Sequence, residues 1–204
     1  TIRKTKRRGN IMLPSIIVYL SIPASIIAYF FYLRNIIRGH TKPNLISWFL
    51  WMLPALLGAF FQVKAGAGLA ALPVAMAGLG PVCVIIFSIF KRNAFWRINS
   101  FDLICGSFSL LALIIYLFTQ NLGISIFFAI LSDTLAFFPF FLKSWHFPET
   151  ETSSVYFVGL FNNTLGLLII TDWSFAVYSF VLYLVVSNII ELSILYRKKI
   201  FKIS

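Results

Sequence analysis

The uncharged stretch of residues 103–132, LICGSFSLLALIIYLFTQNLGISIFFAILS, decides how many helices this chain forms. A helix crosses about 30 Å of hydrocarbon with about 20 residues, so these 30 residues are too many for one span. Thr119, Gln120 and Asn121 are polar, and Gly123 follows them, a combination typical of a tight turn. We therefore expect two helices here, near 101–118 and 122–142.

The composition indicates that lipid covers most of the folded surface. Of 204 residues, 60% are hydrophobic, 18% aromatic and only 11% charged. A soluble domain carries roughly 25% charged residues because its surface faces water. This excludes a soluble enzyme, a disordered chain, a disulfide-stapled secreted domain and a nucleic-acid-binding module. The expected partner is a lipid bilayer, with no nucleic acid.

Five more apolar runs complete the count, near 11–34, 45–63, 68–90, 153–171 and 174–196. Seven helices with short connections predict an all-α integral membrane protein in which consecutive helices are antiparallel. The apolar stretch of the first helix is too long for a cleavable signal peptide.

The distribution of basic residues predicts the orientation. The chain has 17 Lys and Arg against six Asp and Glu. Eleven of the 17 fall on the C-terminal side of a seven-span arrangement, which places the C-terminus in the cytoplasm and the N-terminus outside a plasma (inner) membrane. Five others precede the first helix and oppose this orientation: Arg3, Lys4, Lys6, Arg7 and Arg8.

The arrangement of the helices indicates an internal repeat. An offset of 108 residues aligns 11–93 with 119–201 without a gap, so that three spans and their connections coincide. It pairs Ala28 with Ala136 and Lys91 with Lys199. We expect a basic tail (1–10), a first three-helix repeat (11–93), a linker helix (94–118) and a second three-helix repeat (119–201). Such parallel repeats are related by an axis along the membrane normal.

This 3+1+3 arrangement resembles the SWEET and PQ-loop superfamily, and uncharacterised bacterial membrane proteins of the same architecture. Residues 40–48 (HTKPNLISW) are similar in placement to the segment after the first helix of those families, and residues 143–151 (KSWHFPETE) occupy the corresponding place in the second half. The resemblance implies a solute carrier. The chain lacks a Pro-Gln dipeptide, however, and has Asn162 where the offset places the partner of Pro54.

Asp133 is the candidate functional residue with the most unusual position. It lies near the middle of the 122–142 helix, where insertion of a carboxylate costs about 3 kcal/mol, so it should face a bundle interior or a cavity. Asn162 and Asn163 lie at a similar depth in the next helix, with Asn188 and Trp51 as further candidates. We expect a substrate site from these five residues, or else hydrogen bonds between helices with no role in transport.

Other polar residues and prolines suggest moving parts. The resemblance implies hinges at Pro23, Pro54 and Pro139. Lys42 in the first cytoplasmic loop could pair with Glu149 or Glu151 in the corresponding second loop and form a gate, although solvated loops explain these charges as well.

Asp102 and Glu191 are expected to form ion pairs near the helix ends, with Arg97 and Arg197 respectively. All five tryptophans are expected close to the membrane interfaces. Trp51 is expected one turn deeper in the membrane than the others. Cys83 and Cys105 are expected to be buried thiols.

We expect no enzyme, no cofactor and no metal site, because the chain has no motif for them. The leading hypothesis is a carrier of a small polar solute, either sugar-like or proton-coupled, that works by alternating access. The alternative is a non-transporting membrane subunit, scaffold or receptor-like protein. The oligomeric state stays open.

Overall fold

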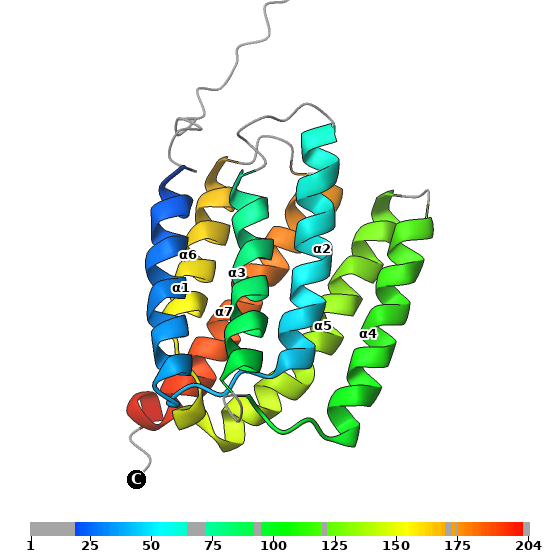
Figure 1. Ribbon diagram of the computed structural model, residues 1–204. Coiled ribbons are helices and arrows are strands. Elements are labelled where there is room, and N and C mark those ends of the chain that lie inside the picture. Colours follow the sequence, from blue (N-terminus) through cyan, green and yellow to red (C-terminus); the bar gives the residue numbers. More distant parts are fainter. Residues whose placement is uncertain are drawn as a thin grey trace, which may run out of the picture.

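The computed structural model describes residues 19–64, 72–91, 95–119, 122–169, 173 and 175–201. These residues form seven α-helices and no strand, so the all-helical prediction is confirmed (Figure 1). The helices are α1 Ser21–Ile37, α2 Leu45–Lys64, α3 Leu72–Phe90, α4 Ser100–Phe118, α5 Leu122–His146, α6 Ser154–Ile169 and α7 Phe175–Phe201. A short 3₁₀ helix, η3 (Pro148–Thr150), joins α5 to α6.

The helix boundaries follow local signals in the sequence. α4 begins at a capping box, in which the Asn99 side chain accepts a hydrogen bond from the Asp102 amide and the Asp102 side chain accepts one from the Asn99 amide. α5 continues past the expected end at 142 to His146, and Lys143 in its last turn has a buried side chain. The expected start of the first helix, 11–18, lies outside the described residues.

The helices pack as two groups of three, with α4 beside them. In the first group (α1–α3), α3 lies between α1 and α2, and in the second group (α5–α7), α7 lies between α5 and α6. The groups meet where α1 packs on α6 and α2 on α5, while α4 packs on α5 and α2. Exchanging α1 with α5, α2 with α6 and α3 with α7 leaves the neighbours among these six helices unchanged, whereas α4 packs on α2 and α5 without equivalent contacts to α6 and α1 in the described part of the chain.

Two glycines allow α3 to approach its neighbours closely. A Cβ atom on Gly80 would lie 2.0 Å from Cζ of Tyr29 in α1, and one on Gly78 would lie 2.6 Å from a methyl group of Leu56 in α2. Larger residues at these two positions would push the helices apart. The small-residue part of the sequence before α3, residues 65–71, lies outside the described residues.

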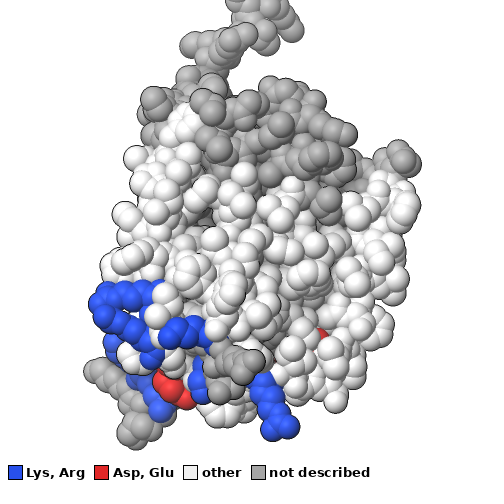
Figure 2. All heavy atoms as spheres, in the orientation of Figure 1, with Lys and Arg blue, Asp and Glu red and all other residues white. Residues whose placement is uncertain are grey.

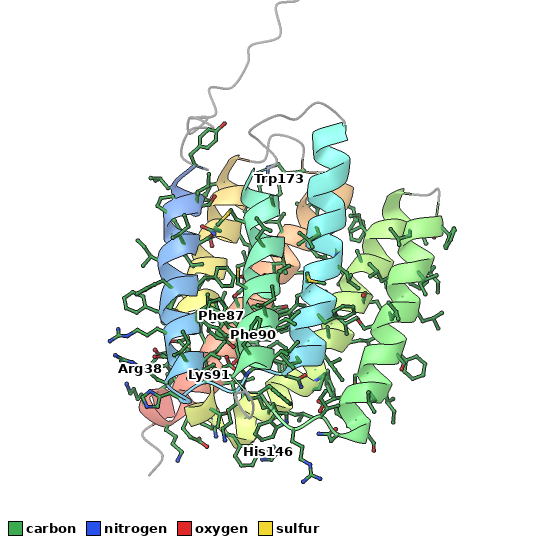
Figure 3. The ribbon with its side chains drawn as sticks, viewed as in Figure 1. Arg38, Phe87, Phe90, Lys91, His146 and Trp173 are labelled. Atoms are coloured by element: carbon green, nitrogen blue, oxygen red, sulfur yellow. The ribbon has the colours of Figure 1, made fainter. Side chains whose placement is uncertain are left out.

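The outer surface is apolar along the helices and basic at one end. Exposed side chains along the bundle include Phe30 and Phe108, each more than half exposed. Figure 2 shows Lys and Arg gathered at one end, which we call the basic end. Figure 3 places Arg38, Lys91 and His146 at this end and Trp173 at the opposite end. Two segments, Ile126–His146 and Tyr178–Ile200, are long and apolar enough to cross a membrane.

Two expectations about side-chain positions were partly wrong. Trp48 is buried in the core rather than at an interface, because α2 turns it toward Tyr32 and Trp51. Cys105 is buried as expected, whereas Cys83 is exposed.

Candidate functional site

Two matching hydrogen bonds cross between the groups. The Ser47 hydroxyl in α2 donates to the Ala136 carbonyl in α5 at 2.7 Å. The Ser154 hydroxyl in α6 donates to the Ala28 carbonyl in α1 at 2.9 Å. Ala28 and Ala136 are partners under the 108-residue offset, and the two serines are one residue out of that register. The α2–α5 and α1–α6 contacts are therefore built alike.

An aromatic layer (Tyr32, Trp48, Phe140 and Tyr156) fills the space between these contacts. The Tyr32 and Trp48 ring centroids are 5.1 Å apart in the first group, and the offset turns this pair into Phe140 and Tyr156, 5.5 Å apart in the second. All four side chains are buried, and Trp51 packs on Phe140 at 5.2 Å. The layer therefore packs the two groups against each other as part of the buried core.

A charged cluster, the Glu151 cluster (Tyr32, Lys143, Glu151 and Tyr156), lies beside the aromatic layer. The Glu151 carboxylate forms a salt bridge with Lys143 and accepts a hydrogen bond from the Tyr32 hydroxyl. It also accepts one from the Tyr156 hydroxyl at 3.1 Å. The Lys143 ammonium group donates to the Thr150 carbonyl at 3.3 Å. Since Tyr32 belongs to α1 and the others to the second group, this carboxylate links the two groups.

The two charges of this cluster are withdrawn from solvent. The side chains of Lys143 and Glu151 are only 2% and 0% exposed. Burying such a pair removes the hydration of both ions, so it stabilises the protein only while every bond in the cluster is kept. Removing either Lys143 or Glu151 leaves the other as an unpaired charge in the interior. The cluster is therefore well suited to hold one definite closed arrangement.

The connections beside the cluster add further links between the groups. Asn35 donates to the Thr152 hydroxyl at 2.9 Å, and the Lys42 amide donates to the Thr150 carbonyl at 2.9 Å. The expected gate therefore differs from the observed contact. Lys42 joins the second connection through its backbone while its side chain is exposed, and Glu151 pairs with Lys143 instead.

Glu149, the other expected gate residue, is exposed. Among the described residues, Lys143–Glu151 is the one salt bridge. The carboxylate of Glu149 therefore takes no part in an ion pair there, and Glu151 alone carries the charged contact of this connection.

The asparagines of α6 point to different partners. Asn162 donates to the Ser25 hydroxyl in α1 at 3.0 Å, across the interface between the groups. Its side-chain oxygen is buried with no hydrogen-bond partner among the described residues. Asn163 instead donates to the carbonyl of Gly159 in its own helix. Of the two, Asn162 is the one placed between the groups.

Asn188 and Trp51 lie apart from Asn162. The Asn188 amide donates to the Leu184 carbonyl in α7, and its side chain packs against Gly159 of α6. Trp51 packs on the Phe137 ring at a centroid distance of 4.4 Å. Asn188 thus belongs to the α6–α7 contact and Trp51 to the α2–α5 contact.

Asp133 is buried in α5 near the Tyr183 hydroxyl of α7. One of its carboxylate oxygens has no hydrogen-bond partner in the described part of the chain. No described hydrogen bond joins it to Asn162. Under the offset, however, Asp133 corresponds to Ser25, the residue that Asn162 binds. Asp133 and Ser25 therefore lie at equivalent positions in their groups.

The three expected hinge prolines all lie in helices. Pro54 lies inside α2 and Pro139 inside α5, while Pro23 is the third residue of α1 and is exposed. A proline inside a helix removes one backbone hydrogen bond, so α2 and α5 each contain a point where bending costs less.

The expected ion pairs at the helix ends were wrong. The Asp102 side chain is buried and accepts a hydrogen bond from Asn44 at 2.9 Å as well as capping α4. Arg197 donates to the carbonyls of Ile194 and Trp145. Glu191 is fully buried. Each carboxylate has an arginine a few residues away in the sequence, but the fold surrounds both carboxylates with other helices.

The positions of Lys143, Tyr32 and Tyr156 in the sequence do not predict that they belong to a site. Lys143 follows an apolar run like the first charge of a loop, and no feature of the sequence indicates that three separate elements meet at Glu151. The described residues contain no group of His, Cys, Asp and Glu side chains that could hold a metal ion.

No family model, no curated protein and no solved structure matches this chain. The candidate site therefore has to be interpreted from its own geometry. It consists of a polar contact between Ser25 and Asn162, an aromatic layer, and a charged cluster at the basic end, all located between the two groups of helices.

Proposed function

We propose that this chain is a seven-span membrane carrier of a small polar solute, built from two three-helix repeats of the SWEET and PQ-loop kind. The solute would be bound between the groups, near Ser25, Asn162 and Asp133. The groups would move against each other to expose this site to one side at a time. Sugar-like solutes and coupling to a proton are both compatible with such side chains.

The neighbour pattern of the helices supports the repeat. An exchange of the two groups preserves the contacts among their six helices and turns the Ser154–Ala28 contact into the Ser47–Ala136 contact, one residue out of register. A carrier of this type needs two halves that meet through similar surfaces, because it alternates between two related arrangements.

The Glu151 cluster is the observation that carries the functional proposal. A static contact between helices is at least as stable when apolar side chains of similar volume replace a buried ion pair. A contact built from one carboxylate and three donors can instead be broken and remade as a unit. It lies at the basic end, where it would close the cytoplasmic side of a pathway.

The orientation belongs to the same proposal. The basic end carries the last turns of α1 and α7 with Arg34, Lys198 and Lys199. Positive charge is enriched on cytoplasmic loops, so we place this end and the C-terminus in the cytoplasm and the N-terminus outside.

A non-transporting membrane subunit is the second candidate. It is favoured by the dense aromatic packing between the groups and by an open apolar groove of about 350 Å³ between α1 and α6, lined by residues such as Ile27, Phe31 and Phe161. In this interpretation the groove would receive a helix of a partner, and the Glu151 cluster would fix the orientation of the bundle.

Uptake into liposomes separates the two candidates. The purified chain should take up some member of a panel of labelled sugars, polyols and amino acids. Asn162→Ala and Asp133→Asn should abolish that uptake, because they remove polar groups from the proposed site. Thr164→Ala, on the exposed face of α6, should leave it unchanged. Absence of uptake for the whole panel, or full uptake by both site variants, would favour the subunit.

A further inference from the structure

Glu191 in α7 is a fully buried carboxyl group. Neither of its carboxylate oxygens has a hydrogen-bond partner among the described residues. An ionised carboxylate in such a place lacks both hydration and a compensating bond, which strongly disfavours the charged form. The neutral acid is a hydrogen-bond donor and is much less costly to bury.

The groups around Glu191 come from every element that packs on this part of α7. α5 contributes Lys143 and the Ser144 hydroxyl, which is also buried without a partner. α6 contributes Tyr156, and the connection that follows η3 contributes Glu151. A protonated Glu191 has an acceptor within reach in the Ser144 hydroxyl.

Lys143, the cation near Glu191 in the part of the chain that the structure describes, is already engaged. Lys143 forms the salt bridge with Glu151 and also binds the Thr150 carbonyl. Lys143 and Glu151 together are neutral. When Glu191 is protonated, the three side chains Lys143, Glu151 and Glu191 have no net charge. When Glu191 is ionised, their net charge is −1 and two carboxylates lie beside one ammonium group.

We propose that Glu191 is a proton-binding site that holds its proton while the Glu151 cluster is closed, and that loss of this proton opens the cluster. An ionised Glu191 competes with Glu151 for Lys143 and repels the Glu151 carboxylate. Tyr32 binds that carboxylate from the first group, so the link between the groups weakens. The inference rests on the proposed function for the movement of the two groups, but not for the transport of a solute.

The first test observes the proton itself. Infrared spectra of the chain in lipid nanodiscs should contain the carbonyl stretch of a protonated carboxylic acid that disappears as the pH is raised. Glu191→Gln should weaken this pH-dependent band, since the buried Asp133 carboxyl group remains, and Glu149→Gln, which changes an exposed carboxyl group, should leave it unchanged. A band that is identical in the wild type and Glu191→Gln at every pH would overturn the proposal.

The second test observes closure. In a background with Cys83→Ala and Cys105→Ala, the pair Asn35→Cys and Thr152→Cys spans the two groups, because the native side chains are hydrogen bonded at 2.9 Å. The pair Ser109→Cys and Ser132→Cys joins α4 to α5 and serves as the control, since its native hydroxyls are 3.2 Å apart. The control corrects for the higher reactivity of thiols at high pH.

The ratio of the two cross-linking rates should fall as the pH rises, by at most tenfold per pH unit when opening releases one proton. Glu191→Gln should make the ratio independent of pH. The same pH dependence in Glu191→Gln as in the wild type would overturn the proposal, as would a ratio that responds to added sodium or potassium instead of pH. Neither test uses solute uptake, so a chain that transports nothing can still pass or fail both.

Discussion

Replacing Glu151 with glutamine tests whether the buried charge cluster stabilises the fold. Glutamine has the shape of glutamate and can still accept a hydrogen bond from Tyr32 or Tyr156. It carries no charge, however, and with its carbonyl oxygen on the two tyrosines its NH2 group faces Lys143, where it cannot accept a hydrogen bond. The Lys143 side chain, only 2% exposed, would keep a positive charge without a counterion.

The size of the effect follows from this burial. Removal of one partner from a buried ion pair costs about 3–5 kcal/mol because the remaining charge is uncompensated. Since about 1.4 kcal/mol corresponds to a factor of ten, the unfolding equilibrium should shift by roughly two to three and a half orders of magnitude. A second substitution, Lys143→Met, removes the uncompensated charge, so the double variant should recover most of the lost stability.

Reversible unfolding in mixed detergent micelles measures these differences. Glu149→Gln is the matched control, because the same chemical change two residues away affects an exposed side chain and should stay within about 0.5 kcal/mol of the wild type. A loss for Glu151→Gln as small as that of Glu149→Gln would refute the reasoning. So would a double variant less stable than Glu151→Gln alone.

Three further substitutions test the packing and the helix ends in the same unfolding assay. Gly80→Ala should lose about 1–3 kcal/mol because the new methyl group meets the ring of Tyr29, whereas Gly166→Ala, whose nearest atom is 3.5 Å away, should lose much less; equal losses would contradict the close packing. Asn99→Ala should lose about 1 kcal/mol by removing the cap of α4, and an unchanged midpoint would show that the cap is dispensable. Ser154→Ala should lose about 1 kcal/mol with its hydrogen bond across the groups, and no loss would mean that this bond adds nothing to the contact.

The helices could be predicted because most of their boundaries have a local cause; the end of α5 at His146, beyond the expected 142, is an exception. Charged residues and turn residues separate apolar runs, and the polar segment after Phe118 separates α4 from α5 as expected. The number of helices follows from that one division. Such signals depend only on neighbours in the chain, which is why a single sequence contains them.

The charged cluster could not be predicted because its cause is not local. Lys143 follows an apolar run and looks like the first charge of a loop. It is buried because Glu151, eight residues later, and the hydroxyls of Tyr32 and Tyr156 surround the same point in space. A charge in a sequence cannot reveal whether its partners will arrive from distant helices.

Trp48 illustrates the same limit for an apolar side chain. Its position near the start of α2 suggested an interface, since tryptophan favours the boundary of a bilayer. Whether Trp48 is buried depends instead on its angular position on α2. Trp48 faces Tyr32 on α1, and this contact depends on how the groups pack.

The most direct measurement is the distance between the two groups at the basic end, by pulsed electron paramagnetic resonance in nanodiscs. Spin labels at Arg38 and Glu149 occupy exposed positions on the first and second groups. Two distance populations are expected in the wild type, and Glu151→Gln should enrich the longer one because it breaks the cluster. A single distance that is unchanged by Glu151→Gln would contradict the proposed movement of the two groups.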